Sequence, residues 1–260
     1  MKRLIVSLVL LVAGTAGASD FGEADLVRRG RMVFDSQFTE AEQDRLKPLI
    51  VRGMGNVAAF FGERRSELPD FFFCKSIECA QYMAGSEWRS FAADKPQMRY
   101  FDAKHWFERP AIVITVLAKH PKARDEALLN VITHELSHIE FRARAGREPV
   151  PAWFEEGLAT VVGGARCSPD ARGIDDLAKL STLSAWTIHT RPSAGMANAT
   201  YCQAALEVLA WTEQRGGAKA IVNLLASLPK KSFESQYGSF MTAQGIPATN
   251  PTGIGQDNNH

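Results

Sequence analysis

Two histidines in the segment THELSH are the side chains of this sequence best suited to chemistry. His134 and His138 are four residues apart, so on an α-helix they lie on one face, a turn apart, and can both direct an imidazole nitrogen at one metal ion. Glu135 is turned by about 100° around the helix from His134. From there its carboxylate can reach a water molecule beside the metal rather than the metal itself. The spacing predicts a metal site with an adjacent general base.

The residues around this pair favour a buried helix over a solvated one. The apolar neighbours are Leu128, Val131, Ile132, Leu136 and Ile139. A buried imidazole needs a partner, and zinc is a good candidate. A polar histidine cluster without metal is the alternative.

A catalytic zinc ion needs a third protein ligand and an open coordination position. The downstream segment PAWFEEGLAT predicts a short helix with two adjacent carboxylates, Glu155 and Glu156. Small residues surround Glu156 and would let this helix approach the first one closely. Two glutamates near a helix start also interact favourably with the helix dipole, so the pair alone does not identify a ligand.

HELSH followed downstream by WFEEGLA resembles the gluzincin metallopeptidases, and most closely the peptidase MA-like domains of exported bacterial proteins. The motif-specific part covers residues 111–162. The resemblance implies that His134, His138 and Glu156 bind one catalytic zinc ion (Zn2+) and that Glu135 is the general base.

One position departs from the family pattern. Thermolysin-like members often place an aspartate four residues after the ligand glutamate, where it orients a zinc histidine. Thr160 occupies that position here. A hydrogen-bond acceptor for the histidine must then come from elsewhere.

Gluzincins commonly stabilise the oxyanion of the reaction with a tyrosine or histidine beyond the third ligand. Tyr201, at the start of a predicted helix, and His189, in a predicted loop, are the two candidates. An ordinary core tyrosine and a solvated loop histidine are the alternatives.

The elements that must hold these residues follow from periodicity and from helix-ending residues. Helices are predicted at 39–61 (capped by Thr39 and Glu42, and interrupted or kinked near Pro48), 76–84, 123–145, 152–162, 175–184, 201–213 and 218–228. Strands are predicted at 70–74, 98–101 and 111–117. Strands early and helices late indicate an α+β fold, with a small mixed β-sheet packed on the HExxH helix and a mainly helical C-terminal part. The resemblance implies the catalytic core of a thermolysin-like metallopeptidase.

The strand 111–117 directly precedes the histidine helix. In the resembling family such a strand borders the active-site cleft, and the substrate pairs with it as an added strand. The apolar run AIVITVL fits an interior strand equally well.

Residues 1–18 have the charged start, apolar run and small-residue cleavage site of a secretory signal peptide. Residues 19–244 are predicted to form a single domain, and the polar segment 245–260 a disordered tail. In an exported protein the four cysteines favour disulfides. Local closure favours Cys74–Cys79, which leaves Cys167–Cys202.

The chain has 29 acidic and 30 basic residues, so its net charge gives no argument for a nucleic-acid partner. No second long apolar run follows the signal peptide, so no membrane span is expected after its removal. The sequence therefore predicts an exported zinc-dependent peptidase, periplasmic or secreted, acting on peptides or proteins. The absence of an amine-binding motif favours an endopeptidase. The alternative is a catalytically silent, zinc-stabilised binding or assembly module on the same scaffold.

Overall fold

The computed structural model describes residues 21–84, 97–101, 110–115, 121–146, 148–190 and 194–237. The predicted signal peptide and tail lie outside these residues. The strands are β1 (Leu26–Arg29), β2 (Met32–Asp35), β3 (Asp70–Cys74), β4 (Gln97–Phe101) and β5 (Ala111–Thr115). The α-helices are α1 (Glu40–Phe61), α2 (Ile77–Ala84), α3 (Pro121–Ala145), α4 (Ala152–Val162), α5 (Leu183–Thr190), α6 (Ala194–Gln214) and α7 (Ala218–Ser227). Short 3-10 helices are η1 (Glu23–Asp25), η2 (Leu177–Leu180) and η3 (Leu228–Lys230).

The strands form one mixed sheet in the order β1-β2-β3-β5-β4. The central pairs β2–β3 and β3–β5 are parallel, while the outer pairs β1–β2 and β4–β5 are antiparallel. The α+β class and the small mixed sheet are confirmed. Of the two alternatives for the strand starting at Ala111, the interior strand is confirmed: β5 is paired on both sides and β4 is the edge strand beside it, so a substrate cannot pair with β5 as an added strand.

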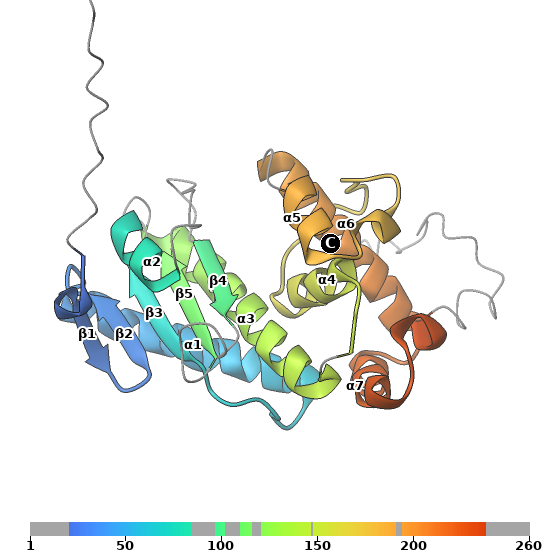
Figure 1. Ribbon diagram of the computed structural model, residues 1–260, viewed down its shortest axis with the longest axis horizontal. Coiled ribbons are helices and arrows are strands. Elements are labelled where there is room, and N and C mark those ends of the chain that lie inside the picture. Colours follow the sequence, from blue (N-terminus) through green and yellow to red (C-terminus); the bar gives the residue numbers. More distant parts are fainter. Residues whose placement is uncertain are drawn as a thin grey trace, which may run out of the picture.

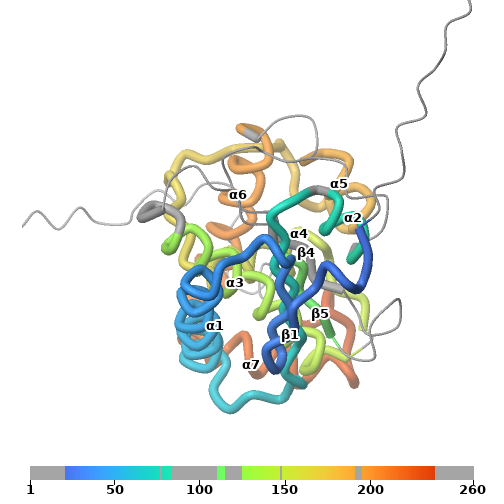
Figure 2. The backbone as a smooth tube through the Cα atoms, turned by 90° about the vertical axis from the view of Figure 1, so that its left-hand side faces the viewer, coloured from blue at the N-terminus to red at the C-terminus, as the bar shows by residue number. Residues whose placement is uncertain are grey.

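Both faces of the central strands are buried, which explains their unbroken apolar sequences. One face packs against α1 and α3 through side chains such as Phe73 and Ile114. The opposite face packs against α2 through side chains such as Phe72 and Val113. Figure 1 shows the sheet at one end of the molecule and helices α4 to α7 at the other, and Figure 2 shows α1 and α3 side by side.

Helix α1 begins at the predicted capping box, where Thr39 and Glu42 satisfy each other's backbone N–H groups. The helix runs through Pro48 without the predicted interruption. Pro48 and Asp44, whose carbonyl loses its helical partner there, are both exposed. Water can hydrate that carbonyl, which lowers the cost of a proline inside the helix.

Helix α3 is fixed against its neighbours at two points. Next to the sheet, a Cβ atom at Gly53 of α1 would lie 2.9 Å from the Ile132 side chain, so the glycine allows the two helices to approach closely. Near its end, the buried Glu140 accepts hydrogen bonds from the backbone N–H groups of Arg65 and Ser66 and from the Arg144 guanidinium. Burial alone would raise the pKa of Glu140, but these donors lower it. The helix that carries the two histidines is therefore held at its middle and near its C-terminal end.

The C-terminal half is helical, as predicted, but its boundaries differ in two places. The prediction of one helix at 175–184 is wrong, because the short helix η2 is followed there by the start of α5. At the start of α5, the Thr182 hydroxyl accepts a hydrogen bond from the backbone N–H of Ala185. Helix α6 begins at Ala194, so Tyr201 lies inside it rather than at its start. Helix α4 has the predicted bounds.

Both predicted disulfides, Cys74–Cys79 and Cys167–Cys202, are confirmed. None of the described helices has the length and apolar character needed to cross a membrane. The two disulfides are compatible with an exported protein.

Candidate metal centre

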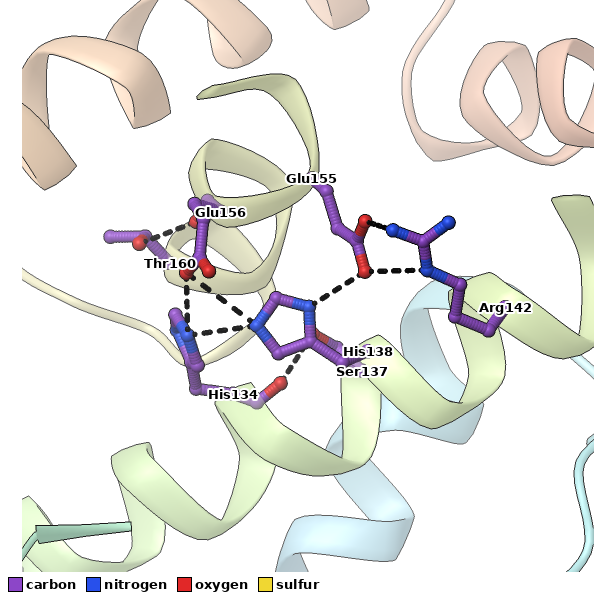
Figure 3. A network of polar contacts seen from close by, with 7 residues as sticks. All are labelled: His134, Ser137, His138, Arg142, Glu155, Glu156 and Thr160. Atoms are coloured by element: carbon purple, nitrogen blue, oxygen red, sulfur yellow. Dashed lines mark hydrogen bonds and ion pairs between the residues drawn. The ribbon is translucent and has the colours of Figure 1, made fainter. Parts of the chain in front are cut away.

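Helices α3 and α4 bring His134, His138 and Glu156 together (Figure 3). The Nε2 atoms of the two histidines are 3.2 Å apart. Oε2 of Glu156 lies 3.4 Å from Nε2 of His134 and 3.6 Å from Nε2 of His138. Three potential ligand atoms therefore form a nearly equilateral triangle.

The triangle fits a tetrahedral ion. Ligand atoms about 2.1 Å from a tetrahedral zinc ion lie about 3.4 Å from one another. The three measured separations range from 3.2 to 3.6 Å. Two imidazoles and a carboxylate are also a donor set that zinc accepts. The three residues could hold a metal ion and would leave one tetrahedral position free.

Glycines allow the short approach of α4 that this triangle requires. A Cβ atom at Gly157, next to Glu156, would lie 2.5 Å from the carbonyl oxygen of Ala204 on α6. A Cβ atom at Gly163, where α4 ends, would lie 3.0 Å from the Asn130 carbonyl and 3.4 Å from Cβ of His134. Helix α4 therefore packs between α3 and α6 with no room for a side chain at Gly157 or Gly163. This close packing determines the distance between Glu156 and the two histidines.

Glu135, the predicted general base, is buried on α3. Tyr201 approaches the same region from α6, with its ring 6.0 Å from the ring of His134 and in edge-to-face contact with Trp186. Burial raises the pKa of Tyr201, and the charges of Glu156 and Glu135 raise it further. The phenol is protonated at neutral pH, as an ordinary tyrosine is, and its hydroxyl interacts with Glu156.

Glu155 has a separate role from Glu156. Its Oε1 atom lies 3.2 Å from Nδ1 of His138, the ring nitrogen that faces away from the triangle. The Arg142 guanidinium donates to both oxygens of Glu155, through Nε at 3.0 Å and through a second nitrogen. Thr160, in the position where the family pattern often has aspartate, donates instead to the Glu156 carbonyl. The acceptor for a histidine comes from Glu155, as Figure 3 shows.

The cluster concentrates negative charge in a buried place. Burial disfavours a charge on His138, but the nearby Glu156 and Glu155 carboxylates outweigh it and raise the pKa of His138 well above its usual value. Burial likewise opposes the charge on Glu156, yet the two histidines lower its pKa. Such a site attracts a proton or a metal cation.

His189, the other candidate for oxyanion stabilisation, lies in the last turn of α5 rather than in a loop. Its Nε2 atom is 3.0 Å from the Gly173 carbonyl, so the described hydrogen bond ties it to the backbone and not to the histidine–glutamate triangle. Tyr201 is the candidate that the structure brings to the site.

Sequence reasoning missed the contribution of Arg142 and Trp186 and treated Glu155 as a mere neighbour of the ligand. One signal was present, because Arg142 stands four residues after His138 and so lies on the same helix face. Nothing comparable marks Trp186.

Comparison of the chain with known protein families, with curated proteins and with solved structures gives no match.

Proposed function

We propose that this chain is an exported, zinc-dependent endopeptidase of the gluzincin type, with a thermolysin-like catalytic core. The observation that carries the proposal is the triangle of His134, His138 and Glu156, whose ligand atoms are spaced as in a tetrahedral zinc site. A general-base candidate and a neutral phenol next to this triangle favour a catalytic site over a purely structural one.

Each residue has a distinct task in peptide hydrolysis. Zinc, when bound, supplies Lewis-acid chemistry, which lowers the pKa of a water ligand and polarises a carbonyl group. Glu135 accepts the proton of the attacking water and passes it to the leaving amine. Tyr201 donates its phenolic hydrogen to the oxygen that becomes negative during attack. The ring of Tyr201 lies 6.0 Å from the ring of His134, which supports this role.

The sheet offers a place for an extended substrate. Strand β4 is the edge strand nearest to α3, and its outer side is not paired within the described residues. A peptide added to this edge would run beside the helix that carries His134 and Glu135. We assign substrate pairing to β4, in place of β5.

The experiment compares the zinc-loaded chain with Glu135→Gln on two matched peptide libraries, one blocked at both ends and one with free ends. We expect the wild type to cleave internal bonds and the variant to lose about 10²–10⁴-fold in rate, while both bind one zinc ion. Matching zinc content with no cleavage by either protein would support the binding-module alternative. Equal cleavage by both would contradict the assignment of Glu135, and cleavage restricted to peptides with a free end would indicate an exopeptidase.

A further inference from the structure

We infer that Glu155 is a positioning residue for the metal centre, which fixes the ring orientation and the tautomer of His138, and that Arg142 holds Glu155 in this task. The inference rests on the proposed zinc site and deepens it.

The contact itself is specific. His138 has one ring nitrogen in the ligand triangle and the other 3.2 Å from Glu155 Oε1. Neither side chain is more than one-tenth exposed. At this distance, with water excluded, the carboxylate accepts the hydrogen of Nδ1. The lone pair of Nε2 then remains on the side of the ring that faces His134 and Glu156, where a ligand atom is needed.

Arg142 explains why Glu155 stays in this position. Its guanidinium donates to both oxygens of the carboxylate. The Arg142 side chain is 42% exposed, so it compensates the charge of Glu155 from the solvent side. The contact also keeps Glu155 away from the metal position, so two neighbouring carboxylates do not compete for one ion. Glu156 is left as the single carboxylate of the triangle.

The arrangement replaces the missing acidic residue at Thr160. A hydroxyl there bonds to the backbone of its own helix and has no role toward the histidines. The carboxylate belongs instead to Glu155, the residue before the ligand Glu156, and it contacts His138, the second histidine of the motif. Its arginine comes from α3, one turn after that histidine.

The test measures zinc affinity of the full chain, by competition with a coloured chelator, for the wild type, Glu155→Ala, Glu155→Gln and Arg142→Gln. Asp125→Asn is the control, because it neutralises another carboxylate of α3, which Arg45 holds away from the site through two guanidinium nitrogens. In parallel, the Nδ1–H proton of His138 is followed by NMR in the zinc-bound proteins, and urea unfolding is measured without metal.

We expect Glu155→Ala to bind zinc about 10–100-fold more weakly than the wild type, with Glu155→Gln and Arg142→Gln in between and Asp125→Asn unchanged. The Nδ1–H signal of His138 should be slow to exchange in the wild type and lost in Glu155→Ala. A purely structural link between α3 and α4 would instead lower stability in Glu155→Ala and Arg142→Gln and leave the zinc affinity and the proton signal as they are, which would overturn the inference. Because Arg142 is partly exposed, its variant remains informative if Glu155→Ala does not fold.

The two proposals fail in different ways. A wild-type chain that binds no zinc contradicts the proposed function and this inference together. If the wild type binds zinc and Glu155→Ala binds it with the same affinity, only this inference is contradicted.

Discussion

The replacement Gly157→Ala tests how far the metal centre depends on helix packing rather than on the ligands themselves. The added methyl group would lie 2.5 Å from the carbonyl oxygen and 2.6 Å from the carbonyl carbon of Ala204, where ordinary contact is 3.4–4 Å. Both atoms are backbone of α6, so no side-chain rotation relieves the clash. Helix α4 must move away from α6, and it carries Glu156 with it.

The magnitude follows from two opposing effects. Overfilling a packed interface costs about 1–3 kcal/mol, and a rigid backbone neighbour favours the upper end of this range. Alanine in a helix regains about 1 kcal/mol relative to glycine. We therefore expect Gly157→Ala to lower the free energy of unfolding by about 2 kcal/mol, which lowers the melting temperature of a chain of this size by about 4–8 °C.

Gly55→Ala provides the matched control. Gly55 lies within α1, and a Cβ atom there would have no heavy atom within 4 Å. The same substitution should raise stability at this position by about 0.5–1 kcal/mol. Both variants would be unfolded in urea without metal, and their zinc affinities measured by chelator competition. Equal stability of Gly157→Ala and the wild type, or equal shifts in both variants, would refute the packing explanation.

Three further changes have defined outcomes. Tyr201→Phe should lower kcat for peptide hydrolysis by about 10²–10³-fold at unchanged zinc content, measured by steady-state kinetics; an unchanged kcat would remove Tyr201 from the reaction. Joint replacement of Cys167 and Cys202 by serine opens a crosslink between residues 35 positions apart and should cost about 4 kcal/mol of unfolding free energy from loop entropy, measured in urea against the oxidised parent. The contribution of Glu140 is complete above its ordinary pKa of 4.5 and is lost as the pH falls through its lowered folded value. Glu140→Gln leaves the buried Arg144 without its carboxylate partner, so it should cost about 3 kcal/mol at pH 7 and flatten the fall in stability below the ordinary pKa of 4.5; an unchanged fall below that pH would contradict the assigned shift.

The parts of the fold with local stop signals could be predicted from the sequence. Helix α4 begins after Pro151 and ends at Gly163 and Gly164, and its predicted bounds are those observed. Gly164 has a positive φ, a backbone conformation that residues other than glycine rarely adopt. The glycine itself therefore indicates where the helix ends. The capping box of α1 is local in the same sense.

Features that depend on distant partners could not be predicted in this way. Strands β1 and β2 have four residues each and were missed, because short strands carry little pattern of their own and are stabilised by pairing. Strand β5 is interior because β4 pairs with its second edge. An apolar strand sequence does not indicate whether one edge or both edges are paired. The effect of Pro48 depends on which face of α1 is exposed, which the neighbouring α3 decides.

The candidate site divides along the same line. His134 and His138 belong to one helix, where a spacing of four fixes their relation before any tertiary structure exists. Glu155 and Glu156 belong to another helix, and successive side chains on it point about 100° apart. Residue spacing alone does not show which of them faces the histidines, because that depends on how α4 is rotated against α3. Only the family resemblance selected Glu156.

That rotation is set by residues that perform no chemistry. Gly157 faces Ala204 and Gly163 faces α3, and each position excludes a side chain. With these two faces fixed, Glu156 points at the Nε2 atoms of the histidines and Glu155 points at Nδ1 of His138 and at Arg142. A change of rotation by one residue would exchange the two carboxylates and place an arginine-bound group in the ligand triangle. The identity of the ligand is therefore a property of the α4 packing surface, so substitutions at its small residues should impair metal binding while every ligand remains in the sequence.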